Sequence, residues 1–216
     1  MKDERNVLPA LASVTGLAWM AAVLLISANH KGMDPSGDRA YDWANRAHTL
    51  ALVLLLATVI AIHRIVRSGQ LTGSRATTAL VIGATLMLVG NILSFWGALF
   101  TDGTSEEFWG GWAGWLVFLP GTMLILGGFI GLAIAARSWP GISNAQRWQI
   151  GSAGLFLTIT TITWAGSVVV TLVPALLAVF ALLATGTTVA QAQAQAQTGA
   201  GSPTTPLPSG ARTPTS

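Results

Sequence analysis

The sequence contains no cysteine and few charged residues. Without cysteine there is no disulfide, thiolate metal site, covalently attached c-type haem or cysteine nucleophile. Charged residues make up 9% of the 216 residues, against roughly a quarter in soluble domains, while hydrophobic residues make up 52%. A soluble fold of this length needs more polar surface than these side chains provide. The composition therefore excludes a conventional soluble enzyme and indicates a membrane protein.

The sequence also lacks nucleotide-binding motifs and a concentrated basic stripe. Neither a P-loop nor a dinucleotide fingerprint is present. The eleven Lys and Arg residues, which exceed the acids by three, are scattered over several polar segments of the chain and form no single stripe. Nucleic acid is therefore not an expected partner, because its binding calls for clustered positive charge. The partner we expect is the lipid bilayer itself.

Five long apolar runs dominate the chain. A bilayer core about 30 Å thick requires roughly 20 apolar residues per helix, and four runs meet this requirement: residues 7–28, 47–66, 77–100 and 112–136. The last run, residues 150–184, would form a single helix of about 52 Å at 1.5 Å per residue. This length exceeds one crossing, so we expect the run to fold back on itself.

Local signals support this hairpin. Ser143 and Gln146 form a capping-box pattern that would begin a helix before residue 150 and extend it to Thr163. Residues 164–167 then supply an interfacial tryptophan and a glycine turn, and residues 168–184 make another span. The sequence thus predicts an all-α, polytopic integral membrane bundle with six transmembrane helices, five being the alternative.

The carboxyl-terminal part of the chain changes composition. We place the helical bundle in residues 1–186 and a low-complexity, disordered cytoplasmic tail in residues 187–216, because this tail has too little apolar surface to fold. Alanine and glutamine favour helix, so residues 191–197 can extend the last helix into water.

Charge asymmetry predicts the orientation. The amino end, the 64–75 and 137–147 connections and the tail hold eight Lys or Arg and two acids, whereas the alternate connections hold three basic and six acidic residues. By the positive-inside rule both termini are cytoplasmic. We therefore expect a multi-pass protein of the cell membrane.

The acidic residues gather in the connections predicted to lie outside. Such carboxylates could bind a hard cation such as calcium, but their spacing fits no known calcium loop, and Arg39 and Arg46 are available as partners. We favour an ordinary solvated rim over a metal site. The residues concerned are Asp34, Asp38, Asp42, Asp102, Glu106 and Glu107.

Histidines raise the alternative of a haem-binding redox protein, since membrane b-type haems lie between imidazoles on different helices. His30 ends the first span and His48 begins the second, so the two could face each other near the outer surface. His63 lies about 22 Å deeper than His48. We favour interfacial roles for all three and expect no cofactor.

Polar groups within the spans are few. Asn91 is the most polar deep residue, with Ser94 one turn away. Such groups form interhelical hydrogen bonds or contact a permeant solute, and we favour the hydrogen bond. The fifth span is rich in threonine, which can bond its own preceding turn. These threonines are Thr158, Thr160, Thr161 and Thr163.

Small residues predict close helix packing within the bundle or between subunits, as in a homo- or hetero-oligomer. A stripe of them runs along the third span, and a G-x-x-x-G pattern lies in the fourth. Tryptophans gather near the span boundaries, and Trp19 alone sits in mid-span. The small residues are Ala79, Gly83, Gly90, Ser94 and Gly97 in the third span, and Gly127 and Gly131 in the fourth.

No acidic or basic residue lies in the middle of a span, which disfavours proton-coupled pumps, intramembrane aspartyl proteases and voltage sensors. No catalytic residue is predicted. The leading hypothesis is a non-enzymatic membrane component or accessory subunit. A small-solute transporter or channel with an uncharged pathway, formed by Asn91, Ser94 and the fifth-span threonines, is the first alternative, and the haem-binding protein is the second.

Overall fold

The structure is a computed structural model that describes residues 4–30, 39–97, 113–163 and 166–200. In these ranges it is all-helical, without strands. Two short segments, η1 (Val66–Gln70) and η4 (Ala136–Ser138), continue α2 and α4. The six long helices are α1 (Glu4–Asn29), α2 (Arg39–Ile65), α3 (Ser74–Phe95), α4 (Gly114–Ala135), α5 (Asn144–Thr163) and α6 (Val168–Ala200).

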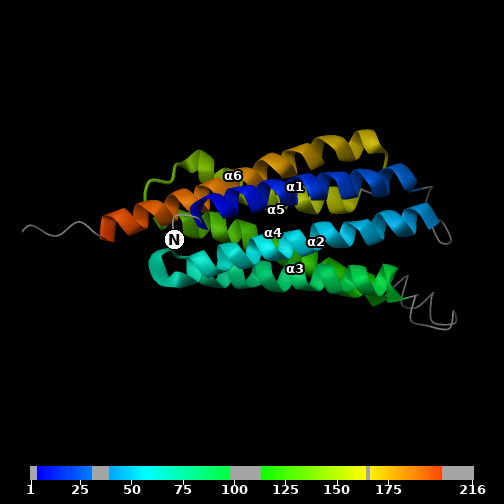
Figure 1. Cartoon of the computed structure of the whole chain (residues 1–216), viewed down its shortest axis with the longest axis horizontal. Helices are drawn as coiled ribbons and strands as arrows, with labels where there is room; N and C mark the ends of the chain where they lie inside the picture. The colour runs from blue at the N-terminus through cyan, green and yellow to red at the C-terminus, as the bar shows by residue number, and fades with distance from the viewer. Residues whose placement is uncertain (1–3, 31–38, 98–112, 164–165, 201–216) are drawn as a thin grey trace, which may run out of the picture.

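The helices lie alongside one another, and successive helices run in opposite directions (Figure 1). Their contacts form a closed ring. Each packs mainly against its neighbours in sequence, and α6 closes the ring against α1. Both ends of the described chain lie at the same end of the bundle, here called the basal end. The opposite end, where α1 stops and α2 begins, is called the distal end.

The contact between α1 and α6 depends on glycine. A Cβ on Gly16 would lie 2.9 Å from Cα of Val179, and one on Gly186 would lie 2.8 Å from Cβ of Ala12. These distances are shorter than real side chains tolerate, so the two helices lie as close as their backbones allow. The first and last helices are therefore tightly joined.

Five helices of the described chain are long and apolar enough to cross a membrane: α1, α2 with η1, α3, α4 with η4, and α6. The remaining helix, α5, has 20 residues, which at 1.5 Å per residue give about 30 Å. Its first turns carry Gln146, Arg147 and Gln149, which reduce its mean hydropathy. The structure thus confirms a membrane-type bundle of six helices, and the sixth crossing stays a prediction.

The predicted hairpin between α5 and α6 is present. Gln146 accepts the backbone N–H of Ser143 at 2.9 Å, and the Ser143 hydroxyl accepts the backbone N–H of Gln146 at 3.3 Å, which completes the capping box. The other end of α5 is Thr163, as expected. Gly166 turns the chain by donating its N–H to the Thr163 carbonyl at 2.8 Å.

The last helix is longer than the apolar run alone suggests. It continues to Ala200, in agreement with the helical extension predicted for residues 191–197. Val189 and Ala192 are fully buried against the rest of the bundle, so packing continues beyond residue 186. Residues 201–216 lie outside the described part of the chain.

Glycines also set the distance between α3 and α4. A Cβ on Gly83 would lie 2.8 Å from the carbonyl oxygen of Gly121, and one on Gly90 would lie 2.6 Å from that of Gly114. The predicted close packing of the α3 stripe is therefore found within the bundle. In α4, Gly131 and the neighbouring Gly128 lie against Ala76 of α3, whereas Gly127 faces open space, so close packing between subunits at Gly127 stays a prediction.

Candidate functional site

A cluster of polar side chains joins α2 to α3 near the distal end. Thr49 donates its hydroxyl to Oδ1 of Asn91 at 2.8 Å, and Nδ2 of Asn91 donates to the backbone carbonyl of Asn45 at 3.3 Å. The indole N–H of Trp96 donates to Oγ1 of Thr49 at 2.9 Å. We call Asn45, Thr49, Asn91 and Trp96 the distal polar cluster. It uses both ends of the Asn91 carboxamide, which is only 1% exposed.

Arg46 closes this cluster at its edge. Its Nε–H donates to the carbonyl of Phe95 at 2.7 Å, where the last carbonyls of α3 lack helical partners. The guanidinium lies 5.0 Å from the ring of Trp43 and 5.7 Å from that of Trp96, within cation–π range of both. Arg46 therefore ties α2 to the end of α3 through its backbone bond and its aromatic neighbours.

Aromatic side chains fill the middle of the ring. Trp19 of α1 is fully buried and donates its indole N–H to Oγ1 of Thr160 on α5 at 2.9 Å. The ring of His48, on α2, lies edge-on to Trp19 with centroids 4.9 Å apart, and 6.5 Å from the ring of Phe118 on α4. Four helices thus meet through side chains at this point, and the space between them is occupied by the protein itself.

The two histidines of the haem hypothesis have different surroundings. His30 lies beside Tyr41, with ring centroids 5.3 Å apart, whereas His48 is buried between Trp19 and Phe118. Within the described ranges, no group of three or more His, Asp or Glu residues could hold a metal ion. The haem hypothesis stays a hypothesis.

The predicted acidic rim lies almost entirely outside the described residues. Of its six carboxylates only Asp42, in the first turn of α2, belongs to the described chain. The others, which are Asp34, Asp38, Asp102, Glu106 and Glu107, fall in the ranges 31–38 and 98–112. The cation-binding hypothesis is therefore neither supported nor opposed.

The remaining polar candidates are Ser94 and the threonines of α5, most of which bond to the backbone of their own helix. Ser94 is 9% exposed and packs against α4 at Gly114. Thr160 and Thr161 donate to the carbonyl of Leu157, and Thr163 donates to that of Ile159, as expected for threonine in a helix. The hydroxyl of Thr158 is buried without a hydrogen-bond partner among the described residues.

Further polar pairs connect neighbouring helices along the ring. Thr15 and Thr58 share a hydrogen bond of 2.7 Å between α1 and α2, and Ser27 donates to Thr171 at 3.0 Å between α1 and α6. Near the basal end Nδ1 of His63 lies 2.8 Å from Oγ1 of Thr77 on α3. Several of the rare polar groups of the spans therefore form interhelical contacts.

Comparisons with known proteins add no constraint to this geometry. No family model, curated protein or solved structure matches the chain. The function must be inferred from the residues described above.

Sequence reasoning found Asn91 but gave Trp19 no role. Asn91 is conspicuous because an amide inside an apolar run must find a partner. Trp19 resembles any apolar residue of the first span, and its partner Thr160 lies 141 residues away. The usable signal was its position, since membrane tryptophans gather at the interfaces and a mid-span tryptophan needs a bundle-side acceptor.

Proposed function

We propose that this protein is a non-enzymatic component of the cell membrane, an accessory subunit whose polar interior holds its helices together. The observation that carries the proposal is the bonding of Asn91. This residue was the best candidate for a solute-binding group, yet its carboxamide is buried and engaged by Thr49 and Asn45. A polar group that is hydrogen-bonded to a neighbouring helix stabilises the packing of the helices and is not available to line an aqueous path.

The filled centre of the ring supports the same function. Trp19 is fully buried, and its indole N–H is satisfied by Thr160. The ring of His48 on α2 packs against it, and the ring of Phe118 on α4 lies on the other side of His48. A continuous uncharged pathway would have to displace these bulky side chains, so the interior favours a structural component over a transporter.

The proposed orientation places the basal end in the cytoplasm. The described connections at this end carry Arg64, Arg67, Arg75, Arg137 and Arg147, whereas Arg39 and Arg46 are the described basic residues of the distal end. Short connections rich in arginine stay on the cytoplasmic side. With six crossings, this orientation would put both termini in the cytoplasm.

A flux and stability experiment on Asn91→Leu tests the function. We expect proteoliposomes containing either form to equilibrate glycerol or urea no faster than protein-free vesicles. The variant should unfold at a lower temperature in detergent, because interhelical hydrogen bonds in membranes contribute about 0.6 kcal/mol each and at most about 1.7. Light scattering measures the flux, and circular dichroism measures unfolding.

The matched control is Thr85→Val, which removes a hydroxyl that bonds only its own helix at the Val81 carbonyl and is exposed on α3. Its unfolding temperature should stay close to that of the parent protein. A solute flux above that of protein-free vesicles, abolished by Asn91→Leu and kept by Thr85→Val, would overturn the proposal in favour of a transporter.

A further inference from the structure

An apolar groove runs along the outer face of the bundle between α4 and α5. Its volume is about 410 Å³, within the range of about 300–1,000 Å³ typical of small-molecule sites. Gly151 and Ala133 face each other across the two helices, with 3.5 Å between Cβ of Ala133 and the place of a Cβ on Gly151. Because neither carries a long side chain, a hollow is left between the larger residues on either side.

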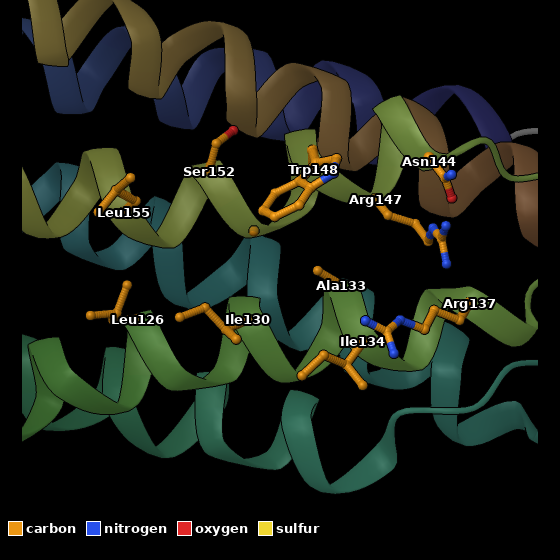
Figure 2. A pocket seen from close by; sticks show the side chains of 11 residues that line it. Leu126, Ile130, Ala133, Ile134, Arg137, Asn144, Arg147, Trp148, Ser152 and Leu155 are labelled. Atoms are coloured by element: carbon orange, nitrogen blue, oxygen red, sulfur yellow. The ribbon is translucent and has the colours of Figure 1, made fainter.

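The groove has one polar and one apolar end (Figure 2). Arg137, which follows α4, and Arg147, in the first turns of α5, place their guanidinium groups at the basal opening. Leu126, Ile130 and Leu155 continue the groove toward the middle of the bundle. No carboxylate is among the eleven lining residues. The groove therefore has two positive charges at its basal end and an apolar lining toward the middle of the bundle.

This pattern matches the chemistry of a phospholipid. Guanidinium groups bind phosphate through paired, charge-assisted hydrogen bonds, and basic pockets between membrane helices bind anionic headgroups. Arg137 lies at the end of the candidate span of α4, which runs from Gly114 to Ser138. If α5 crosses the bilayer beside α4, we expect Arg137 and Arg147 at the level of the headgroups and the apolar part of the groove at the level of the acyl chains. Trp148, which is 80% exposed at the opening, is suited to the interface between the two.

We propose that this groove binds one anionic phospholipid, with its phosphate on Arg137 and Arg147 and one acyl chain along Ile130 and Leu155. Two positive charges without a nearby carboxylate favour a headgroup with net negative charge over a zwitterionic one. The proposal requires that α4 and α5 lie side by side in a bilayer, and it stands whether or not the protein is an accessory subunit.

Native mass spectrometry of the purified full chain tests the site. The protein in detergent is mixed with dioleoyl phosphatidylglycerol or with dioleoyl phosphatidylcholine at equal concentration, and the lipid retained per protein is counted. We expect retention of one phosphatidylglycerol in preference to phosphatidylcholine. The double variant R137Q/R147Q should lose about tenfold in affinity for phosphatidylglycerol, as removal of charge-assisted hydrogen bonds predicts.

A matched charge control is R64Q/R67Q, which removes two exposed arginines of the basal end that do not line the groove. It should keep the bound lipid. Equal losses in R64Q/R67Q and R137Q/R147Q would show a general effect of surface charge and would overturn the site. Equal retention of the two lipids by the parent protein would overturn it as well.

A second pair of variants tests the apolar part. Ile130→Trp fills the groove and should reduce phosphatidylglycerol retention, while Ile82→Trp, at a similarly exposed position on α3, should not. Circular dichroism checks that all variants keep the parent helix content. If Ile130→Trp retains the lipid fully, or if glycerol 3-phosphate displaces it at equal concentration, the site binds only an anion and the lipid proposal fails.

Discussion

At the scale of single residues, Trp19 and Thr160 show how a polar group is handled inside an apolar bundle. The indole N–H of Trp19 is removed from water and from lipid headgroups, and Thr160 supplies its acceptor at 2.9 Å. Thr160 in turn donates to Leu157 in its own helix at 2.8 Å. An unsatisfied N–H at this depth would cost about 1–3 kcal/mol, which makes the pair a specific link between α1 and α5.

A double-mutant cycle measures that link. Thr160→Val should destabilise the protein by about 1–3 kcal/mol, because it leaves the Trp19 N–H buried without an acceptor. Trp19→Phe removes the N–H but also part of the core, so it destabilises as well. In the double variant Thr160→Val should cost much less than in the parent protein. Strictly additive effects on the free energy of unfolding, measured in mixed micelles, would contradict a direct bond.

The residue scale also shows the limits of sequence reasoning. Asn91 was predicted to form an interhelical hydrogen bond, and it does so with Thr49 and Asn45. The sequence could not name these partners, because any helix that presents a hydroxyl or carbonyl at the right depth would serve. A buried polar group in a span therefore predicts that a hydrogen-bond partner exists, but it does not predict which residue the partner is.

At the scale of helices, the α3–α4 pair depends on glycines seven residues apart. Gly83 and Gly90 on α3 meet Gly121 and Gly114 on α4 through close backbone contacts. In lipid the burial of apolar surface gives no drive for association, so close van der Waals packing takes its place. The absence of side chains at these positions is what allows the packing.

The substitution Gly90→Ala should therefore force α3 and α4 apart. Its Cβ would meet the Gly114 carbonyl oxygen at 2.6 Å and the Phe118 nitrogen at 2.7 Å, and neither backbone atom can rotate away. We expect a loss of about 1–3 kcal/mol, typical of overpacking, visible as a lower unfolding temperature.

Gly127→Ala is the control on α4, since a Cβ there meets nothing within 4 Å. Alanine favours helix over glycine by about 1 kcal/mol, so this variant should be as stable as the parent or slightly more stable. Equal destabilisation by the two substitutions would contradict a specific role of the close α3–α4 contact at Gly90.

Helix positions were more accessible to sequence reasoning than helix faces. The apolar runs placed the helices to within a few residues in most cases, and the Ser143–Gln146 pattern located the start of α5. The beginning of α2 was missed by eight residues, since Arg39 precedes the predicted start at residue 47 by two helical turns. Amphipathic residues extend a helix beyond its apolar part, and hydropathy alone does not register them.

At the scale of the whole molecule, the order of helices around the ring could not be derived from the sequence. Each span is apolar on most faces because it meets lipid as well as protein, so hydrophobic periodicity carries little information about neighbours. Trp19 reaching α5 and α6 closing on α1 both depend on contacts between distant segments. Charge asymmetry, in contrast, predicts the orientation of the complete bundle.

Thiol labelling tests that orientation without prior removal of native cysteines, since the sequence has none. Arg39→Cys lies at the distal end and Ser68→Cys at the basal end, and both positions are exposed. In intact cells a membrane-impermeant maleimide should label Arg39→Cys and leave Ser68→Cys unlabelled. Permeabilisation should expose Ser68→Cys as the control. Labelling of Ser68→Cys alone in intact cells would invert the proposed orientation.

The closure of α1 on α6 has a consequence for biogenesis. Gly16 and Gly186 allow these helices to pack closely, and Ser27 donates a hydrogen bond to Thr171 there, yet α6 leaves the ribosome after the other five long helices of the described chain. The surface of α1 around Gly16 therefore stays without its partner until α6 has been translated. Nascent chains that stop before α6 would leave the surface around Gly16 exposed. Quality-control proteases could recognise that exposed surface and degrade the truncated protein.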